Sequence, residues 1–156
     1  MRVKLYFLFL VFGLFATIFA TACRVEAALG ESVDSVESDR EALSAMRGAI
    51  LVHDGYTVHQ AVSDSTIVRE YVSASGVVFA VAWNGVVRPD LTQLLGSYAG
   101  GYQKALEQMP REPGRRHIRV KTNDVVVEQW GHMRNLQGRA YVPTLIPPGV
   151  NIDEIK

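Results

Sequence analysis

Cysteine is almost absent from this chain of 156 residues, since Cys23 is its only cysteine. One cysteine excludes an internal disulfide bond and a zinc site built from cysteine ligands. Cleavage of the chain after Ala27 would also remove Cys23, and the remaining domain would then have no thiol nucleophile. Such a domain depends on its hydrophobic core for stability, and a chain of this length buries about two thirds of its unfolded surface.

An excess of charge of one sign is lacking as well, because the sequence holds 16 basic and 16 acidic residues. A neutral chain has no general attraction to nucleic acid or to an anionic membrane surface. The sequence also has no long repeat and no low-complexity tract, which favours one domain. We therefore expect no nucleic-acid partner and a single globular unit.

Motifs of known catalytic chemistry are absent too. The sequence has no glycine-rich phosphate loop, no nucleophile elbow and no HExxH zinc motif. None of its four histidines stands at helical ligand spacing from another, and only His59 and His117, on predicted strands, are placed to meet across a sheet. These absences predict no metal and no cofactor, and they favour a binding protein over an enzyme.

The first 27 residues have the pattern of a secretory signal peptide. A positive start at Arg2 and Lys4 precedes the apolar run Leu5–Ala22. Val25-Glu26-Ala27 then provides the small residues of a cleavage site before Ala28. We therefore predict that the chain is exported and that cleavage falls between Ala27 and Ala28.

Two other interpretations of this segment stay open. The apolar run is long enough to cross a bilayer, so it would also serve as a retained anchor. The segment Ala20-Thr21-Ala22-Cys23 is similar to a lipobox, in which the cysteine becomes acylated, although such boxes usually carry Leu at their first position. All three interpretations place residues 28–156 in the periplasm or cell envelope, and membrane contact is expected only through the N-terminal segment.

The first part of the predicted domain has the pattern of a short helix followed by strands. Ala28–Asp34 is expected to be a loose lead-in. Ser38 and Glu41 form a capping box, and Gly48 is placed to end the helix that they begin. Turn residues, among them Asp54-Gly55, then separate extended segments at Ala49–Val52, Tyr56–Val62, Thr66–Val72 and Val77–Trp83.

A long helix is predicted over Asp90–Met109, with Asp90 as its N-cap. Its apolar stripe is expected to pack on the large face of the preceding strand, formed by Val77, Phe79, Val81 and Trp83. The stripe consists of Leu91, Leu94, Leu95, Tyr98, Tyr102, Ala105, Leu106 and Met109. Gly96, Gly100 and Gly101 interrupt this pattern, and they indicate either close contact with the sheet or a kink.

Further strands are predicted after the helix, at Arg115–Thr122, Val125–Trp130 and Gly138–Val142. Asn123-Asp124 is typical of a tight hairpin between the first two of them. The order of elements predicts an α+β fold: an antiparallel sheet of about six to seven strands, one long helix packed across it and a short N-terminal helix.

The candidate ligand surface is predicted where Arg69, Tyr71, His132 and Arg134 converge. Arginine and tyrosine are enriched where interfaces concentrate binding energy, and the Gly131–Arg134 turn breaks a strand without an evident folding need. Together with Glu70 and Arg139-Ala140-Tyr141, these residues also suit a structural Arg–Glu ladder across strands, which we favour. The basic segment Arg111–Lys121 is interpreted as a solvated edge rather than as the site.

Seven segments form a recognisable set in this order along the chain: Gly55-Tyr56-Thr57-Val58-His59, Val68-Arg69-Glu70-Tyr71-Val72, Gly76-Val77-Val78-Phe79-Ala80-Val81-Ala82-Trp83, Pro89-Asp90-Leu91 with Leu94-Leu95-Gly96 and Tyr98, Gly131-His132-Met133-Arg134, Gly138-Arg139-Ala140-Tyr141-Val142-Pro143 and Pro148-Gly149-Val150. Together they resemble the bacterial family catalogued as domain of unknown function 2844. The resemblance covers nearly all of the chain from about Ala28 onward and implies an exported domain, but it carries no activity.

The sequence as a whole predicts a cofactor-free exported domain that acts by binding. Its expected partner is another envelope protein, a peptide or a small anionic ligand. An envelope enzyme with an unrecognised His/Arg/Glu site is the alternative, because catalytic groups are assembled in space rather than along the sequence.

Overall fold

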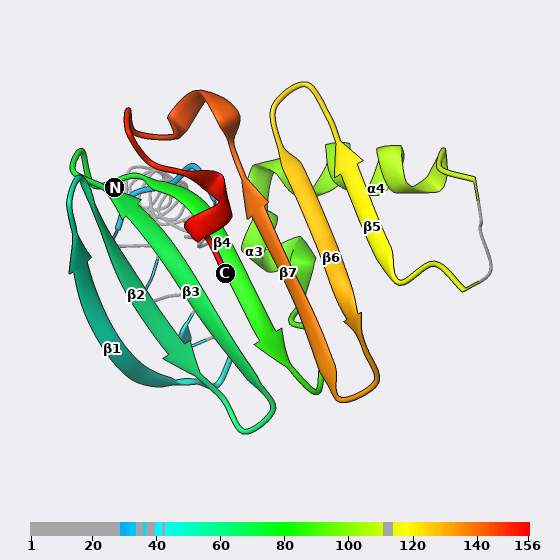
Figure 1. Ribbon diagram of the computed structural model, residues 1–156, viewed down its shortest axis with the longest axis horizontal. Helices are drawn as coiled ribbons and strands as arrows, with labels where there is room; N and C mark the ends of the chain where they lie inside the picture. The colour runs from blue at the N-terminus through cyan, green and yellow to red at the C-terminus, as the bar shows by residue number, and fades with distance from the viewer. Residues whose placement is uncertain (1–28, 34–35, 37–39, 42, 111–113) are drawn as a thin grey trace, which may run out of the picture.

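The computed structural model describes residues 29–33, 36, 40–41, 43–110 and 114–156 (Figure 1). The predicted signal peptide, the cleavage site between Ala27 and Ala28, and Cys23 lie outside these residues. Among the described residues, no helix is long and apolar enough to cross a membrane.

The strands form one antiparallel sheet of seven, in the order β1-β2-β3-β4-β7-β6-β5. The chain lays down β1 to β4 as a meander, crosses one face with its helices, and returns to place β7 beside β4 (Figure 1). The α+β class and the antiparallel sheet are thereby confirmed. The strands are β1 (Met46–His53), β2 (Tyr56–Val62), β3 (Thr66–Ser73), β4 (Val78–Gly85), β5 (His117–Lys121), β6 (Val126–His132) and β7 (Asn135–Tyr141).

The hairpin turns follow from local sequence. Asp54-Gly55 joins β1 to β2, where His53 pairs with Tyr56 and Gly55 takes a positive φ of 84°. Between β6 and β7, His132 pairs with Asn135, and the chain turns through Met133-Arg134. The view that the segment Gly131–Arg134 breaks a strand without a folding need is therefore wrong, because it closes a hairpin.

The helical segment after β4 is confirmed, but it is kinked. It consists of α3 (Leu91–Leu95), the 3-10 turn η1 (Gly96–Tyr98) and α4 (Ala99–Glu107). The Asp90 side chain accepts a hydrogen bond from the Thr92 amide at 2.8 Å and caps α3. Gly96, at a positive φ of 48°, ends α3, whereas a Cβ on Gly100 or Gly101 would meet no atom within 4 Å. The kink, and not close contact with the sheet, is therefore the role of these glycines that the structure supports.

The short N-terminal helix fares differently. Its predicted start at Ser38 lies outside the described residues, and its predicted end is wrong, because Met46–Gly48 belong to β1. Met46 pairs with Val62 there, so tertiary pairing overrides a weak local preference for helix. The lead-in is not loose at its start either. Leu29 is fully buried, and the Gly30 amide donates to the Val78 carbonyl at 2.7 Å.

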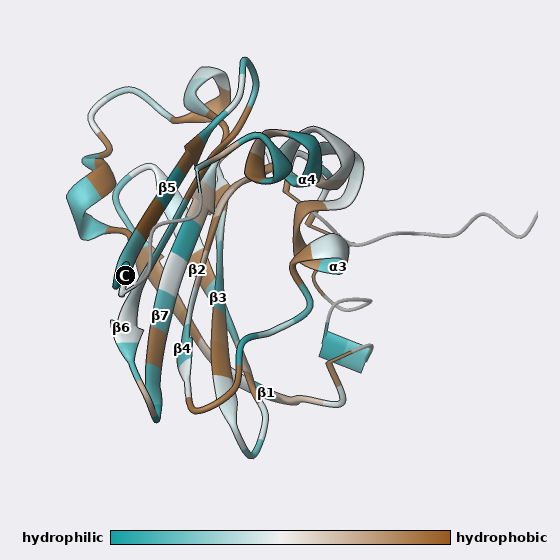
Figure 2. Cartoon of the chain, turned by 90° about the vertical axis from the view of Figure 1, so that its right-hand side faces the viewer, coloured by the Kyte–Doolittle hydropathy of each residue, from teal (hydrophilic) through white to brown (hydrophobic). Residues whose placement is uncertain are grey.

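The two faces of the sheet bury different cores. The helices cover one face, which we call the helix face, and the C-terminal tail, residues 142–156, lies on the other, the tail face (Figure 2). Leu94 and Leu95 pack against Val81 and Trp83 in the helix-face core. The tail includes η2 (Pro143–Leu145) and η3 (Ile152–Glu154), and its Ile155 joins the tail-face core.

The expected large face of β4 is corrected at Phe79. The pairing of β3 with β4 shifts between Tyr71 and Val72, so that Tyr71 lies opposite Ala80 and Val72 opposite Val78. Phe79 is the extra residue of this bulge, which reverses the alternation of side chains. Phe79 consequently packs with Tyr71 in the tail-face core, and Val78 joins the helix-face core instead.

Candidate functional site

The structure does not bring the predicted site residues together. Arg69 and Tyr71 lie on β3, His132 ends β6, and Arg134 lies in the following turn. Across the sheet, Arg69 is in register with Glu128 of β6 through β4 and β7. His132 stands four residues beyond Glu128, about 13 Å further along the strand at the usual rise per residue. The four side chains therefore do not form one surface.

Arg69 and Tyr71 hold the end of the tail. The Tyr71 hydroxyl donates to the Lys156 carbonyl at 3.1 Å and accepts from the Lys156 amide at the same distance. Arg69 donates to Asn84 Oδ1 at 2.6 Å and to the Lys156 carbonyl at 3.4 Å. These contacts give both residues a structural role in docking the tail on the sheet.

His132 and Arg134 lie at an exposed hairpin tip. His132 Nδ1 is 3.3 Å from the Met133 carbonyl, and Met133 itself is 89% exposed. Arg134 takes a positive φ of 69°, which the tight turn requires of it. Nothing in this geometry adds a binding role to the turn, and a role for either side chain in binding stays a prediction.

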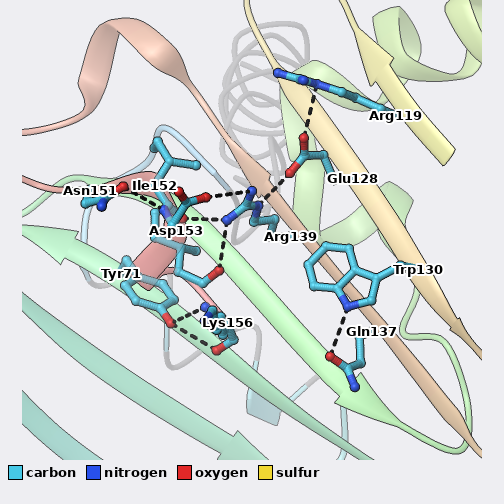
Figure 3. A network of polar contacts seen from close by, with 11 residues as sticks. Tyr71, Arg119, Glu128, Trp130, Gln137, Arg139, Asn151, Ile152, Asp153 and Lys156 are labelled. Atoms are coloured by element: carbon cyan, nitrogen blue, oxygen red, sulfur yellow. Dashed lines mark hydrogen bonds and ion pairs between the residues drawn. The ribbon is translucent and has the colours of Figure 1, made fainter. Parts of the chain in front are cut away.

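The Arg–Glu ladder favoured from the sequence is present at Arg139 and Glu128, with Arg119 as its third member and without Arg69. Arg119, Glu128 and Arg139 lie opposite one another on β5, β6 and β7. Glu128 Oε1 pairs with Arg119 Nε at 3.1 Å, and Glu128 Oε2 accepts from Arg139 Nε at 2.6 Å (Figure 3). Only 8% of the Glu128 side chain and 14% of the Arg139 side chain are exposed, so this charge is neutralised inside the tail face.

Arg139 also fastens the tail to the sheet. Its guanidinium donates to the carbonyl oxygens of Ile152 and Ile155, and its Nη2 stands 3.7 Å from Asp153 Oδ1 (Figure 3). We call Arg139, its contacts to the tail and Glu128 the Arg139 clamp. The clamp uses Nε and Nη1 of the guanidinium as hydrogen-bond donors and holds Nη2 near Asp153, so most of the guanidinium is engaged by the protein itself.

Beside the clamp lies an open groove of about 520 Å³. Its aromatic wall is His117 and Trp130, with ring centres 6.4 Å apart, and the Arg139 guanidinium stands 5.8 Å from the centre of the Trp130 ring. Trp130 Nε1 donates to Gln137 Oε1 at 3.0 Å. Asp153 and Lys156 line the groove from the tail, so it runs between the tail and β5 to β7.

Sequence reasoning missed Trp130 and Gln137. The available signal was alternation, because His117, Trp130, Gln137 and Arg139 occupy polar or aromatic positions that point to one face of their strands. That signal becomes usable only when the register is known. Trp130 lies opposite both His117 and Gln137, which joins side chains from three strands.

The groove suits recognition better than proton transfer. Glu128 is its buried carboxylate, and both of its oxygens are engaged by arginines. Under the tail, burial raises the pKa of Tyr56, and the charge of Glu154 and the Tyr71 hydroxyl raise it further. Among the described residues, no group of three or more His, Cys, Asp or Glu side chains is placed to hold a metal ion. His59 and His117 do not meet, because β3, β4, β7 and β6 separate their strands.

Comparison with known proteins gives a family and little more. Residues 25–155 match the model of a family described as a protein of unknown function (DUF2844). The search of curated proteins finds no match. Among solved structures, the chain is similar to a cysteine-rich secretory protein from Staphylococcus aureus subsp. aureus Mu50, with a TM-score of 0.48 and 9% identity over 75% of this chain and 45% of that protein. The chain thus spans less than half of that protein, and a likeness of this size carries no functional argument.

Proposed function

The chain belongs to the DUF2844 family of proteins of unknown function, and we propose that it is an exported binding module without catalytic activity. Export is supported by the sequence Arg2–Ala27, with its positive start, apolar run and small residues before Ala28. The binding role is supported by the groove on the tail face. Its partner is a peptide segment, presented by another protein of the cell envelope.

The observation that carries this proposal is the aromatic wall of the groove. Trp130 is only partly buried, and His117 is exposed, although both lie on strands whose other face is packed. Tryptophan and arginine are the residue types that most often dominate binding energy. The volume of about 520 Å³ falls within the usual size of small-ligand sites.

The polar groups of the groove favour a peptide over an anion. Asp153 has an 84% exposed side chain, and Lys156 is exposed beside it, so the tail offers one charge of each sign. A peptide has backbone donors and acceptors for such groups and an apolar side chain for Trp130. A small anion in the groove would be repelled by the negative charge of Asp153.

An enzyme is the second candidate, since the groove does gather His117, Glu128 and Arg139. General acid–base catalysis needs a group that is free to exchange a proton with the substrate. Glu128 is bound by Arg119 and Arg139, so only His117 remains for that task. One exposed histidine without an orienting partner among the described residues is a weak basis for catalysis, and binding is the better-supported function.

The binding proposal is tested by selecting peptides from a display library on residues 28–156 and on two variants. Trp130→Ala removes the aromatic wall, and Met133→Ala is the matched control, because it truncates an exposed side chain outside the groove. We expect enriched peptides to lose binding to Trp130→Ala by about tenfold or more, and to keep binding to Met133→Ala. Peptides that bind Trp130→Ala as well as the parent, with both proteins folded, would place the binding surface elsewhere.

Export and signal-peptide cleavage are tested separately by the intact mass of the protein recovered from the cell envelope. Cleavage between Ala27 and Ala28 predicts a chain that begins at Ala28. A mass that carries a diacylglycerol group on Cys23, or the mass of the full precursor, would contradict the proposed cleavage and identify one of the other two forms.

A further inference from the structure

A second, smaller pocket lies near the start of β5, beside the groove, with which it shares the lining residues Trp130 and Gln137. It encloses about 80 Å³ and is lined by arginines from two distant parts of the chain. Arg88 comes from the loop between β4 and α3, and Arg115 and Arg116 come from the segment that leads into β5. Trp83 and Gln129 also line the pocket.

The charged side chains in the described lining of this pocket are arginines. Arg88, Arg115 and Arg116 line it, and its described lining includes no Asp or Glu. Clustered guanidinium groups raise the local positive potential and attract an anion. Guanidinium groups bind carboxylate and phosphate oxygens through paired hydrogen bonds, so the natural occupant is an oxyanion.

A buried amide supplies the second observation. Gln129 is 6% exposed, and its Nε2 donates to the Tyr102 hydroxyl at 2.6 Å. Its Oε1 is buried and has no hydrogen-bond partner within the part of the chain that the structure describes. A buried polar atom without a partner is costly, and such atoms in native proteins call for an explanation.

The Gln129 side-chain amide is able to form a hydrogen bond with an anion in either of its two orientations. If the amide is rotated by 180°, Gln129 Oε1 accepts from the Tyr102 hydroxyl, and Nε2 becomes the unused group and a donor to an oxyanion. In the orientation described, Oε1 accepts from a protonated oxygen, such as that of hydrogen phosphate. Arg88 also interacts electrostatically with Tyr102, the partner of Gln129. Burial raises the pKa of Tyr102, whereas the Gln129 hydrogen bond and the charge of Arg88 lower it.

We propose that this pocket, formed by Arg88, Arg115, Arg116 and Gln129, is a binding site for a phosphate group. The pocket volume corresponds to roughly two to three water molecules, which suits one phosphate group and excludes a nucleotide or a sugar. Several arginines match the double charge and tetrahedral oxygens of phosphate better than the single charge of a carboxylate. The site shares Trp130 and Gln137 with the peptide groove, but its three arginines and Gln129 do not line that groove.

The test is a titration of ¹⁵N-labelled protein with inorganic phosphate, with sodium chloride at matched ionic strength as the reference. The Gln129 side-chain amide is the reporter, because it lines the pocket and is remote from bulk water. We expect a saturable shift of its signals with phosphate, a weaker response to acetate and none to chloride. Shifts that follow ionic strength alone, or a stronger response to acetate than to phosphate, would overturn the proposal.

Variants then localise the binding. Arg88→Ala and Arg116→Ala each remove one exposed guanidinium from the pocket, and each is expected to weaken phosphate binding by about tenfold or more. Lys121→Ala is the matched control, because it removes one positive charge from β5 at a position that pairs with Val126 of the tail face. Equal loss of phosphate binding in Lys121→Ala would indicate general electrostatic attraction, and the site would be rejected.

Discussion

The helix face and the tail face share one sheet but are closed by different interactions. On the helix face, Leu94 and Leu95 are fully or almost fully buried against Val81 and Trp83. On the tail face, Phe79 and Ile155 form a smaller core, and beyond it the tail is held by hydrogen bonds to Arg139 and Tyr71. The helix face is therefore covered through apolar packing, whereas the tail is held on the other face by a few hydrogen bonds.

This difference teaches where the molecule has room for function. Apolar packing buries Leu94 and Leu95 of α3 almost completely, and it gains free energy from every buried side chain. Polar fastening covers only part of a face, and it leaves the groove beside the tail open to solvent. We therefore expect substitutions in the core under α3 to change stability, and substitutions at the uncovered groove beside the tail to change binding.

The largest expected effect is at Leu95, which is fully buried under the helices. Leu95→Ala should lower the free energy of unfolding by about 2–5 kcal/mol, because it removes buried methyl groups and leaves a cavity. Urea denaturation measures this change. Leu106→Ala is the control on the same helical segment, and it should cost much less because Leu106 is 38% exposed. A Leu95→Ala protein with the parent midpoint would show that the helices do not close this face by packing.

A smaller effect is expected at the Arg139 clamp. Arg139→Ala should cost about 1.5–3 kcal/mol, because it removes charge-assisted hydrogen bonds to Glu128 and to the tail, while Arg119 still partners Glu128. Hydrogen exchange at the Ile155 amide should also become faster, since that amide bonds within the tail to Ile152.

Arg119→Ala provides the matched control for the clamp. Arg119 pairs with the same carboxylate, but its side chain is 56% exposed, so its loss should cost less than about 1 kcal/mol. In the part of the chain that the structure describes, Arg119 makes no hydrogen bond to the tail, so exchange at the Ile155 amide should stay unchanged. Equal losses of stability in the two variants would remove the distinction between clamp and surface pair.

The local elements were predictable from the sequence, and the site was not. Asp54-Gly55, Asn123-Asp124 and Asp90 act within a few residues, and they act in the structure as the sequence indicates. The groove depends on register instead. Trp130 lies opposite His117 and Gln137 only because of the register between β5, β6 and β7, and no local sequence pattern predicts that register.

The errors have the same physical origin. Phe79 was assigned to the helix face because strict alternation along β4 puts it there, and one bulge moves it to the other face. Arg69 and Tyr71 are predicted to line a ligand surface because arginine and tyrosine are enriched at interfaces, but in the structure their side chains hold the tail. Arg88 joins Arg115 and Arg116 through tertiary folding, which the sequence does not specify locally.

The smallest expected effect is a change in the pH dependence of stability, caused by His59 near the β1 edge of the sheet. His59 lies on β2, opposite Glu70 of β3, and burial lowers its pKa below the usual 6.5, with the charge of Arg47 lowering it further. The folded protein therefore binds this proton less tightly than the unfolded chain. The stability contributed by neutral His59 is fully present above pH 6.5 and decreases as the pH falls through and below that value.

His59→Gln should remove this part of the pH dependence. Urea midpoints measured at pH 8 and near pH 5.5 should fall more in the parent than in His59→Gln, whereas His53→Gln, which changes an exposed histidine, should behave as the parent. The effect is modest because His59 is only partly buried, so solvent screens its charge. If His59→Gln loses as much stability on acidification as the parent, the acid sensitivity does not come from His59.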